Sequence, residues 1–458
     1  MELFTRIRKK TPPLSALLFV TLLENLYFSH GLPPTASPLF DGRPFVVVWN
    51  APTPACKANK ITLDLAAFAA VTTPGDDPGQ DLTLFYHNRL GLYPYVNEET
   101  KQEFYGGIPQ QANMAAHLKH AQEDTAHYIP SETATGLAVI DWESWRPLWL
   151  RNWGSKQIYK TLSVAYAKKL DPSLSEQQAT EVAKAQFQVA AKEFMAKTLE
   201  QCSTQRPKQL WGYYLFPNCY NYGYNDASKV YTGECSDLVK SRNDELLWLW
   251  QGSSALYPSV YLPAALKDTD KAALYVRNRV QEAMRVAALP KRSSTAPIYA
   301  FNRPVFTDKN KEFLEKIDLV HSIGESAAVG ASGAILWGAS ADFNDKASCE
   351  ALSAYLENTL SPYIANVSAA AKLCSSMLCQ DNGRCVRKNY DSSDYLQLNP
   401  AHFQVQRGPH GKYLATGLAS ADDLSHFANK FTCQCFEGKS CQARLPDNIP
   451  RTEIVIEV

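Results

Sequence analysis

The chain has 458 residues, of which 45% are hydrophobic and 20% charged, so it is long enough to bury one large core plus a small module. Lys and Arg together number 46, and Asp and Glu together also number 46. This balance excludes a global field that would attract a nucleic acid or an anionic membrane, so any anionic partner must contact a local basic patch.

The N-terminus has the pattern of a secretory signal peptide. Basic residues between positions 6 and 10 precede the apolar stretch LSALLFVTLL at 14–23, which is too short to span a bilayer comfortably. We expect residues 1–31 to be removed and the protein to be secreted into the extracellular space, with an acrosomal or lysosomal location as the alternative. The C-terminal PDNIPRTEIVIEV lacks the apolar tail of a lipid-anchor signal, so no stable membrane anchor is expected.

Seven short segments are rich in β-branched and aromatic residues and are predicted as strands. They are 44–50, 82–88, 136–143, 210–216, 259–262, 297–303 and 333–339. Helix-like segments separate them. The clearest begins near Leu174, where Ser173 and Glu176 form an S-x-x-E capping box. Its apolar stripe consists of Ala183, Phe187, Ala190 and Phe194.

Apolar strands that alternate with helices indicate a parallel α/β fold. Chemically active residues gather at the ends of these strands, as they do at one rim of a TIM-type barrel. A doubly wound sheet is the alternative, but no Gly-rich phosphate loop follows the first strand. We therefore predict an α/β protein with a TIM-like, distorted β/α barrel in which one strand is irregular or unrecognised.

Asp141 and Glu143 stand at the end of the apolar segment GLAVIDWE. On a strand, residues i and i+2 share a face, with alpha carbons about 6.5–7 Å apart, so both carboxylates are expected at one rim. Two close like charges do not both ionise cheaply, and one then keeps a proton near neutrality, as a general acid for glycoside cleavage requires. The structural alternative is that these acids pair with Arg146 and Arg151.

Because both acids come from one strand, they lie on one side of a bound sugar, whereas two-carboxylate glycosidases place acids on both sides. A 2-acetamido group of the substrate can supply the missing nucleophile, which points weakly to an N-acetylhexosamine polymer. Nearby aromatic side chains offer stacking faces for sugars, although any one of them is more often a core residue. They are Trp142, Trp145, Trp149, Trp153, Tyr213, Tyr214, Tyr220 and Tyr222.

The chain has 11 cysteines, six of which lie within residues 374–441. In an exported chain this density indicates disulfides rather than zinc, and the order C-x4-C-x5-C, then C-x-C-x5-C, resembles an epidermal-growth-factor-like (EGF-like) module with a long insert. The odd count leaves one cysteine unpaired, and Cys202 is the candidate. The alternative interpretation of Cys202 is a small buried hydrophobic side chain without a further role. Asn366-Val-Ser is expected to be glycosylated.

Six longer motifs together resemble the vertebrate hyaluronidase family, and the chain looks closest to the sperm-type branch of that family. They are GLAVIDWESWRPLW, LWGYYLFPNCYNY, LYPSVYLP, YVRNRVQEAMRV, IGESAAVGASGAILWG and NGRCVRKN. The resemblance implies that Glu143 is the general acid and that Asp141 orients the substrate acetamido group and tunes Glu143. It further implies catalytic roles for Tyr214, Tyr261 and Trp337 around that group.

Substrate-binding positions are expected at Tyr86, Arg279, Asp308, Asn50 and Asn218. The family's disulfide pairing implies Cys56–Cys349, Cys219–Cys235, Cys374–Cys385, Cys379–Cys433 and Cys435–Cys441, which leaves Cys202 single. Asn218 departs from the aspartate that most relatives carry, which puts the local charge and the pH dependence in doubt.

The combined expectation is a monomeric endo-β-N-acetylhexosaminidase that hydrolyses hyaluronan, and chondroitin more slowly, with retention and without a metal or organic cofactor. The expected domains are a signal peptide at 1–31, the catalytic barrel at 32–370, the EGF-like module with its insert at 371–445 and a flexible tail at 446–458. A chondroitin-preferring hydrolase of the same fold and a non-catalytic glycan-binding or adhesion protein are the alternatives.

Overall fold

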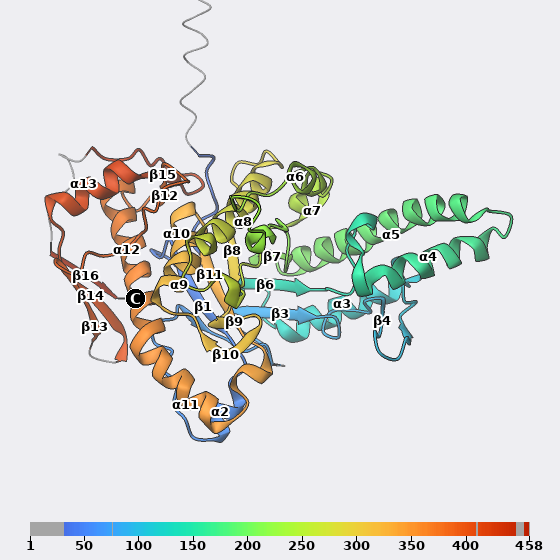
Figure 1. Ribbon diagram of the computed structural model, residues 1–458, viewed down its shortest axis with the longest axis horizontal. Helices are drawn as coiled ribbons and strands as arrows, with labels where there is room; N and C mark the ends of the chain where they lie inside the picture. The colour runs from blue at the N-terminus through green and yellow to red at the C-terminus, as the bar shows by residue number, and fades with distance from the viewer. Residues whose placement is uncertain (1–31, 76, 409–410, 446–452, 458) are drawn as a thin grey trace, which may run out of the picture.

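A ring of parallel strands forms the centre of the molecule (Figure 1). The computed structural model describes residues 32–75, 77–408, 411–445 and 453–457, so the predicted signal peptide lies outside the described residues. The strands of the ring are β1 (Val46–Asn50), β2 (Ala70–Val71), β3 (Leu82–Tyr86), β6 (Gly136–Asp141), β7 (Gln209–Tyr213), β8 (Tyr299–Asn302) and β11 (Gly333–Trp337). Apart from the short β2, whose Val71 is exposed, they are mostly buried and apolar, which suits a parallel sheet that helices cover.

The ring consists of two parallel sheets, in the orders β3-β6-β7 and β2-β1-β11-β8. Isolated parallel bridges join them, between Tyr214 and Tyr257, Leu256 and Ile298, and Ser259 and Phe301. In the part of the chain that the structure describes, β2 and β3 do not pair, so the ring stays open at that edge. The predicted TIM-like barrel architecture is confirmed at this level.

One predicted strand of the ring is wrong. The segment 259–262 forms no strand, and its place is taken by the bridges at 256–259. Pro258 has no amide hydrogen to donate, so a continuous ladder is not available there. The two-residue β2 is the strand that the sequence left unrecognised, in line with the prediction of one such strand. The other six predicted strands are present, with ends that differ by at most three residues.

Helices surround the ring, and one pair extends away from it. They are α2 (Pro54–Ala58), α3 (Met114–Tyr128), α4 (Gln157–Leu170), α5 (Glu176–Gln205), α6 (Asp237–Asp244), α7 (Leu247–Gly252), α8 (Asp270–Ala288), α9 (Lys316–Leu319), α10 (Glu325–Val329), α11 (Lys346–Tyr355), α12 (Ser361–Cys379) and α13 (Ala421–Lys430). Helices α4 and α5 form the long hairpin that projects to the right in Figure 1.

The predicted start of α5 is shifted by two residues. Ser175 and Gln178 form the capping box: the Gln178 amide donates to Ser175 Oγ at 3.3 Å, and the Ser175 amide donates to Gln178 Oε1 at 3.0 Å. Ser173 instead donates to Asp171 in the preceding turn. On the apolar stripe, Ala191 is buried where Ala190 was predicted, because the turn length of 3.6 residues continues the stripe from Phe187 by four.

The C-terminal part packs beside α12, which runs through the predicted boundary at 370 (Figure 1). Its strands are β12 (Gly383–Arg387), β13 (Phe403–Arg407), β14 (Tyr413–Leu418), β15 (Phe431–Cys435) and β16 (Glu453–Glu457). The short strands β4 (Tyr95–Val96), β5 (Glu103–Phe104), β9 (Val305–Phe306) and β10 (Lys309–Phe313) form two hairpins outside the ring. The sequence predicts a flexible tail at 446–458, whereas residues 453–457 pair with β14, since EIVIE alternates as an edge strand does.

All five implied disulfides are confirmed. They are Cys56–Cys349, Cys219–Cys235, Cys374–Cys385, Cys379–Cys433 and Cys435–Cys441. Among the described residues Cys202 is the free cysteine; it is fully buried, and its sulfur lies 3.5 Å from Thr125 Oγ1.

Two sets of contacts attach the C-terminal part to the barrel. Glu325 of α10 is fully buried between Arg277 of α8, with Nε at 2.7 Å, and Arg387 of β12, with Nη1 at 2.7 Å. Residues 33–35, called the strap below, make the second set of contacts. The Thr295 amide donates to Pro34 O at 2.7 Å, and the Thr35 amide donates to Cys435 O at 2.9 Å.

Candidate active site

The two predicted acids lie at the carboxyl end of β6, but they differ in environment. The strand ends at Asp141, so Glu143 lies beyond it rather than on it as predicted. Trp142 turns into the core and stacks on Tyr93, with ring centroids 4.8 Å apart. The Glu143 side chain is 51% exposed and contacts Arg146, whose Nη2 lies 3.2 Å from Glu143 Oε2.

Asp141 is the acid that holds a proton in this arrangement. Burial and, second, the charge of Glu143 raise its pKa from 3.8 to about 8, and Arg146 opposes the rise. Asp141 Oδ1 is buried without a hydrogen-bond partner among the described residues. The expectation that one acid keeps its proton near neutrality is therefore met at Asp141, while the structural alternative, an ion pair with arginine, is met at Glu143.

Four aromatic side chains surround the acids, each from the carboxyl end of a different part of the ring. Trp337 of β11 donates through Nε1 to the Tyr86 hydroxyl at 3.1 Å. Trp337 also stacks on Tyr261, with ring centroids 6.0 Å apart and planes at 17°. Tyr214, which follows β7, lies 6.3 Å from the Tyr261 ring centroid and hydrogen-bonds with the Tyr261 hydroxyl.

These tyrosines remain protonated hydrogen-bond donors. Burial is the largest cause of the raised pKa of Tyr86, to about 12, and the charges of Asp141 and Glu143 add to it. Burial and the charge of Glu143 raise the pKa of Tyr214 as well. Because both acids act on both tyrosines, the structure brings together six of the predicted residues: Asp141, Glu143, Tyr86, Tyr214, Tyr261 and Trp337.

The other predicted residues hold the surrounding loops. Arg279 is buried in α8 and donates to Ser259 O at 2.7 Å and to Asn221 Oδ1 at 2.9 Å, next to the segment that carries Tyr261. Asp308 is exposed and accepts from the Ala264 amide at 2.7 Å. Asn50 is fully buried beside Trp337 in the sheet register and donates to Thr72.

Asn218 lies in the turn after β7. Its Oδ1 accepts from the Tyr220 amide at 2.9 Å, and its backbone oxygen accepts from Asn243 at 3.1 Å. In this geometry Asn218 shapes the turn beside the Cys219–Cys235 disulfide, and its expected contact with a substrate stays a prediction.

The predicted stacking platforms divide into core and surface. Trp142, Trp145, Trp149 and Tyr213 are buried in the main apolar core, so they are not available to a ligand. Trp153 is 61% exposed and Tyr222 is 52% exposed. Tyr220 lies between them, with ring centroids 6.5 Å from Trp153 and 6.4 Å from Tyr222, so the three rings continue from the loop after Glu143.

Two cations at the site were missed by sequence reasoning. Lys156 donates through Nζ to Glu143 O at 2.6 Å. The Arg303 guanidinium lies 5.7 Å from the Trp337 ring centroid and is fixed by Asp342 at 2.7 Å. Neither stands in a motif with the acids, and Arg303 is more than 150 positions from them, so no spacing in the sequence could reveal the contact.

A buried histidine supports the loop that carries Tyr93. The Leu92 amide donates to His117 Nδ1 at 2.8 Å, and His117 Nε2 lies 2.8 Å from Thr198 Oγ1. Gly91 precedes this contact at φ +64°, where a side chain would overlap the His117 ring. Since Nδ1 must stay unprotonated to accept from Leu92, acid conditions oppose this arrangement.

We expect His117 to make the fold weaker in acid. Burial lowers its pKa from 6.5 to about 4, so its contribution is complete above pH 6.5 and is lost as pH falls toward 4, by up to about 3 kcal/mol. Denaturant unfolding at several pH values should show a shallower acid loss for His117→Gln than for the unmodified protein. The matched control is His127→Gln, at an exposed position of α3; an unchanged slope in His117→Gln would contradict the assignment.

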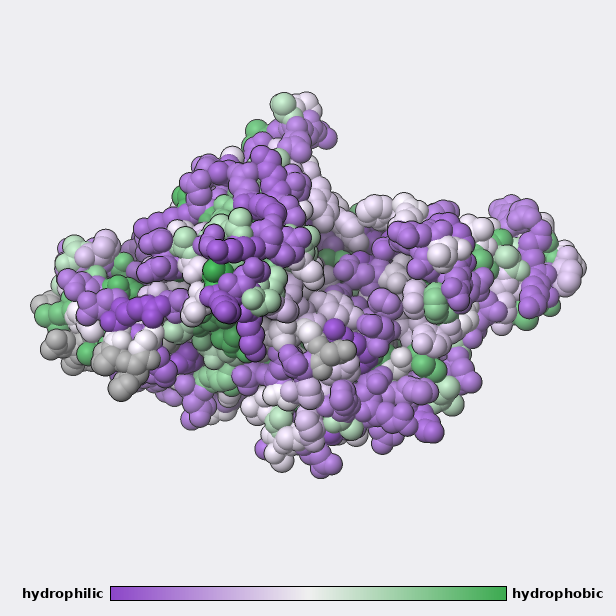
Figure 2. All heavy atoms as spheres, turned by 90° about the horizontal axis from the view of Figure 1, so that it is seen from below, coloured by the Kyte–Doolittle hydropathy of each residue, from purple (hydrophilic) through white to green (hydrophobic). Residues whose placement is uncertain are grey.

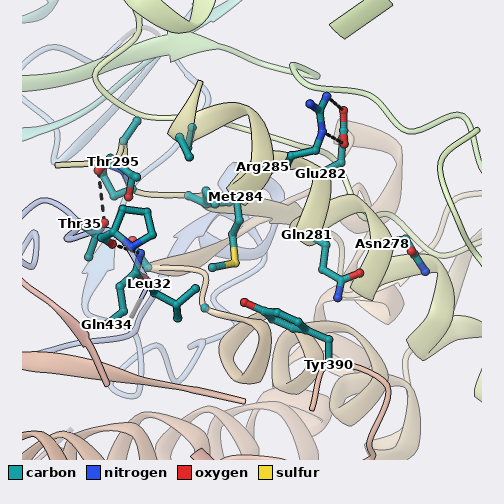
Figure 3. Close-up of a pocket in the computed structure, with 18 of the residues that line it drawn as sticks. Leu32, Thr35, Asn278, Gln281, Glu282, Met284, Arg285, Thr295, Tyr390 and Gln434 are labelled. Carbon is teal, nitrogen blue, oxygen red and sulfur yellow. Dashed lines mark hydrogen bonds and ion pairs between the residues drawn. The ribbon is translucent and has the colours of Figure 1, made fainter. Parts of the chain in front are cut away.

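A larger cavity lies at the opposite end of the barrel, where β8 and β11 begin (Figure 3). It has a volume of about 420 Å³ and is lined by the strap, α8 and the C-terminal part, with Thr35, Met284 and Tyr390 among its residues. None of the predicted catalytic or substrate-binding residues lines it. The face seen in Figure 2 is mostly hydrophilic, with apolar residues in scattered patches.

Over its described length, the chain has no helix that is long and apolar enough to cross a membrane.

Comparison with known proteins identifies relatives over nearly the whole chain. The family model described as hyaluronidase matches residues 34–445. The chain is 44% identical to hyaluronidase-5 of Mus musculus over 96% of its length and 83% of that protein. It is 42% identical to hyaluronidase PH-20 of Homo sapiens over 97% of its length and 86% of that protein.

Solved structures show the same fold. Bee venom hyaluronidase superimposes with a TM-score of 0.61 at 30% identity, over 70% of this chain and 99% of that one. A second structure of the bee venom enzyme, in complex with a hyaluronic acid tetramer, gives a TM-score of 0.59 at 29% identity, over 70% of this chain and 98% of that one.

Proposed function

Because the chain belongs to the hyaluronidase family of glycoside hydrolases, we propose that it is a secreted endo-β-N-acetylhexosaminidase that cuts hyaluronan with retention of configuration. One observation carries the proposal: Asp141, with a raised pKa, stands beside Glu143 within a set of protonated tyrosines and a tryptophan. The hyaluronic acid tetramer in the bee venom relative supports the choice of polymer.

The proposed general acid is Glu143, and Asp141 supplies the proton to it. Burial raises the pKa of Asp141 to about 8, so we place the proton of the pair on Asp141 before substrate binds. A sugar that covers Glu143 removes its solvent, and an acetamido N–H that faces Asp141 stabilises the Asp141 carboxylate. Both effects favour transfer of the proton to Glu143, which then donates it to the leaving glycosidic oxygen as the bond to the anomeric carbon breaks.

The proposed nucleophile belongs to the substrate. The acetamido carbonyl oxygen attacks the anomeric carbon from the face opposite the leaving group and forms a cyclic intermediate. Tyr214 and Tyr261 donate hydrogen bonds to the acetamido group, and the Trp337 ring encloses it. Water then opens the intermediate and gives its proton to Glu143. Two inversions at the anomeric carbon leave the β configuration.

The test of this function combines an assay and product analysis. Release of reducing ends should be measured on hyaluronan, chondroitin and de-N-acetylated hyaluronan. We expect the first to be cut, the second to be cut more slowly and the third to bind without cleavage. Initial products by proton NMR should be β. Early α products would contradict the participation of the acetamido group, and faster cutting of chondroitin would reverse the substrate order.

We propose that the aromatic row at Trp153, Tyr220 and Tyr222 binds further sugars of the polymer. Removing a half-exposed indole from a sugar contact should cost about 1–2 kcal/mol of binding, so Trp153→Ala should raise KM on hyaluronan about fivefold to thirtyfold with little change in kcat. Initial-rate kinetics on long hyaluronan measures this. Leu170→Ala, an equally exposed apolar side chain on α4, is the control, and an unchanged KM in Trp153→Ala would exclude the row from binding.

We further propose the domain plan on which this function rests: a signal peptide at 1–31, a catalytic barrel from residue 32, and an EGF-like module that begins within α12 and extends to residue 445, in a secreted monomer. The disulfides Cys374–Cys385, Cys379–Cys433 and Cys435–Cys441 support the module. Asn366 is the proposed glycosylation site. It is partly buried in α12, and its Oδ1 accepts from the Leu398 amide at 3.1 Å.

A further inference from the structure

A small cavity lies beside the loop that follows β6, next to residues 146–151. Its polar lining consists of Arg146, Arg151, Asn218, Tyr220 and Asn243, and five apolar side chains complete the wall. Its volume is about 20 Å³, and roughly 10–15 Å³ suffices for one water-sized occupant. Any occupant is therefore a single small species rather than part of a sugar.

Arg151 presents an unsatisfied positive charge to this cavity. The residue is 91% buried, being 9% exposed, and its Nη2 has no hydrogen-bond partner. Its guanidinium stacks on the Tyr220 ring, 4.0 Å from the centroid. Among the described residues no carboxylate lies within ion-pair distance of Arg151. Its side chain hydrogen-bonds with Tyr220, and the charges of Arg242 and Glu245 act on it. A buried cation without a carboxylate partner is costly.

The remaining polar groups of the wall do not supply the missing negative charge. Asn218 Oδ1 is occupied by the Tyr220 amide, and Asn243 Nδ2 donates to Asn218 O and to Glu282 Oε1. Arg146, the second cation of the wall, contacts Glu143 from its other side at 3.2 Å. The lining residues thus carry two guanidinium groups and no carboxylate, and Glu143, which contacts Arg146, lies outside the lining and is half exposed.

We propose that this cavity is a site for one small monovalent anion of the size and charge of chloride, held by Arg151 and Arg146. A water molecule could accept from Arg151 but would not balance its charge in an apolar wall. A cavity of this size has room for little more than one water-sized occupant, so the site should prefer chloride and bromide over iodide, sulfate and phosphate.

The anion would act on catalysis through Arg146, a consequence that rests on the proposed function. Glu143 faces Arg146, Lys156 and Asp141, and Arg151 faces Arg242 and Glu245. A bound anion shares Arg146 with Glu143 and adds a negative charge behind it. Both changes oppose loss of the proton that the acid pair donates, so chloride should raise kcat/KM on the alkaline side of the profile, on the order of threefold at pH 7.

Anion binding should be measured directly before activity. Chlorine NMR line broadening is followed in the full-length protein at constant ionic strength, with gluconate as the replacement anion. We expect excess broadening in the unmodified protein and in the control Lys169→Gln, on exposed α4, but not in Arg151→Gln. Bromide should displace the signal, whereas iodide and sulfate should not. Equal broadening in Arg151→Gln and the control would overturn the site.

A second variant covers the case in which Arg151→Gln does not fold. Asn218→Asp places a carboxylate in the cavity wall, so it should abolish the broadening by replacing the anion. In the activity arm, the alkaline limb should depend on chloride in the unmodified protein and not in Asn218→Asp. Because the NMR arm needs no turnover, it decides the anion site even if hyaluronan is not cut. A bromide-soaked crystal with only water in the cavity would also refute the proposal.

Discussion

Glu143→Gln is expected to lower kcat/KM on hyaluronan at least about a hundredfold while leaving binding intact. The amide keeps the shape of the side chain and still accepts from Arg146, which contacts Glu143 Oε2 at 3.2 Å. It cannot give a proton to the leaving oxygen, and positioned general acids typically contribute about a hundredfold to ten-thousandfold. The loss should therefore appear in kcat, with the dissociation constant for a hyaluronan oligosaccharide unchanged within about threefold.

Initial-rate kinetics and oligosaccharide titration together measure this effect. Glu123→Gln, an exposed glutamate on α3 outside the site, is the matched control and should retain full activity. If Glu143→Gln turned over at a rate near that of the control, Glu143 would not be the acid. A loss confined to binding would instead assign it a role in holding the substrate.

Glu325→Gln is expected to lower the free energy of unfolding by about 3–5 kcal/mol. Glu325 is fully buried and is shared by Arg277 and Arg387, each at 2.7 Å. The neutral amide leaves two buried guanidinium groups without a counter-charge, and this penalty exceeds the net contribution of the ion pairs themselves. Because Arg277 is in α8 and Arg387 is in β12, the loss should also loosen the C-terminal part from the barrel.

Denaturant unfolding with the disulfides intact measures the change. The same substitution at the exposed Glu176, which pairs with Lys168, is the control and should cost less than about 1 kcal/mol. A similar cost in both variants would mean that water reaches Glu325 and that the buried pair is screened. An unchanged main unfolding transition, preceded by a separate transition at lower denaturant concentration, would show that the substitution destabilises only the C-terminal part.

The sequence predicted the ring strands and the rim because their signals are local. Runs such as FVVVW and LAVI are apolar over the length of one strand, and a polar residue follows where each strand reaches the rim. The disulfides followed from a resemblance and not from spacing, since Cys56 and Cys349 lie at opposite ends of the barrel sequence. The start of α5 was displaced because two serines, Ser173 and Ser175, both fit a capping pattern.

What the sequence could not supply are properties of three-dimensional packing. The raised pKa of Asp141 depends on how deeply its carboxyl group is buried, and the motif Asp-Trp-Glu does not reveal which of its two acids is the buried one. Whether a tryptophan is core or platform likewise depends on which way its loop turns, so Trp149 and Trp153 differ although they are four residues apart. The cavity beside Arg151 combines residues from 146 to 246 and has no linear signature.

The strap at 33–35 has a consequence for the order in which the protein is assembled during synthesis. Its partners are Thr295 and Cys435, and the latter is translated about 400 residues after Thr35. At about 5–20 residues per second, that is a delay of roughly 20–80 s. The barrel can therefore form before the strap has its second partner, and the first described residues of the chain are among the last to be fixed in place.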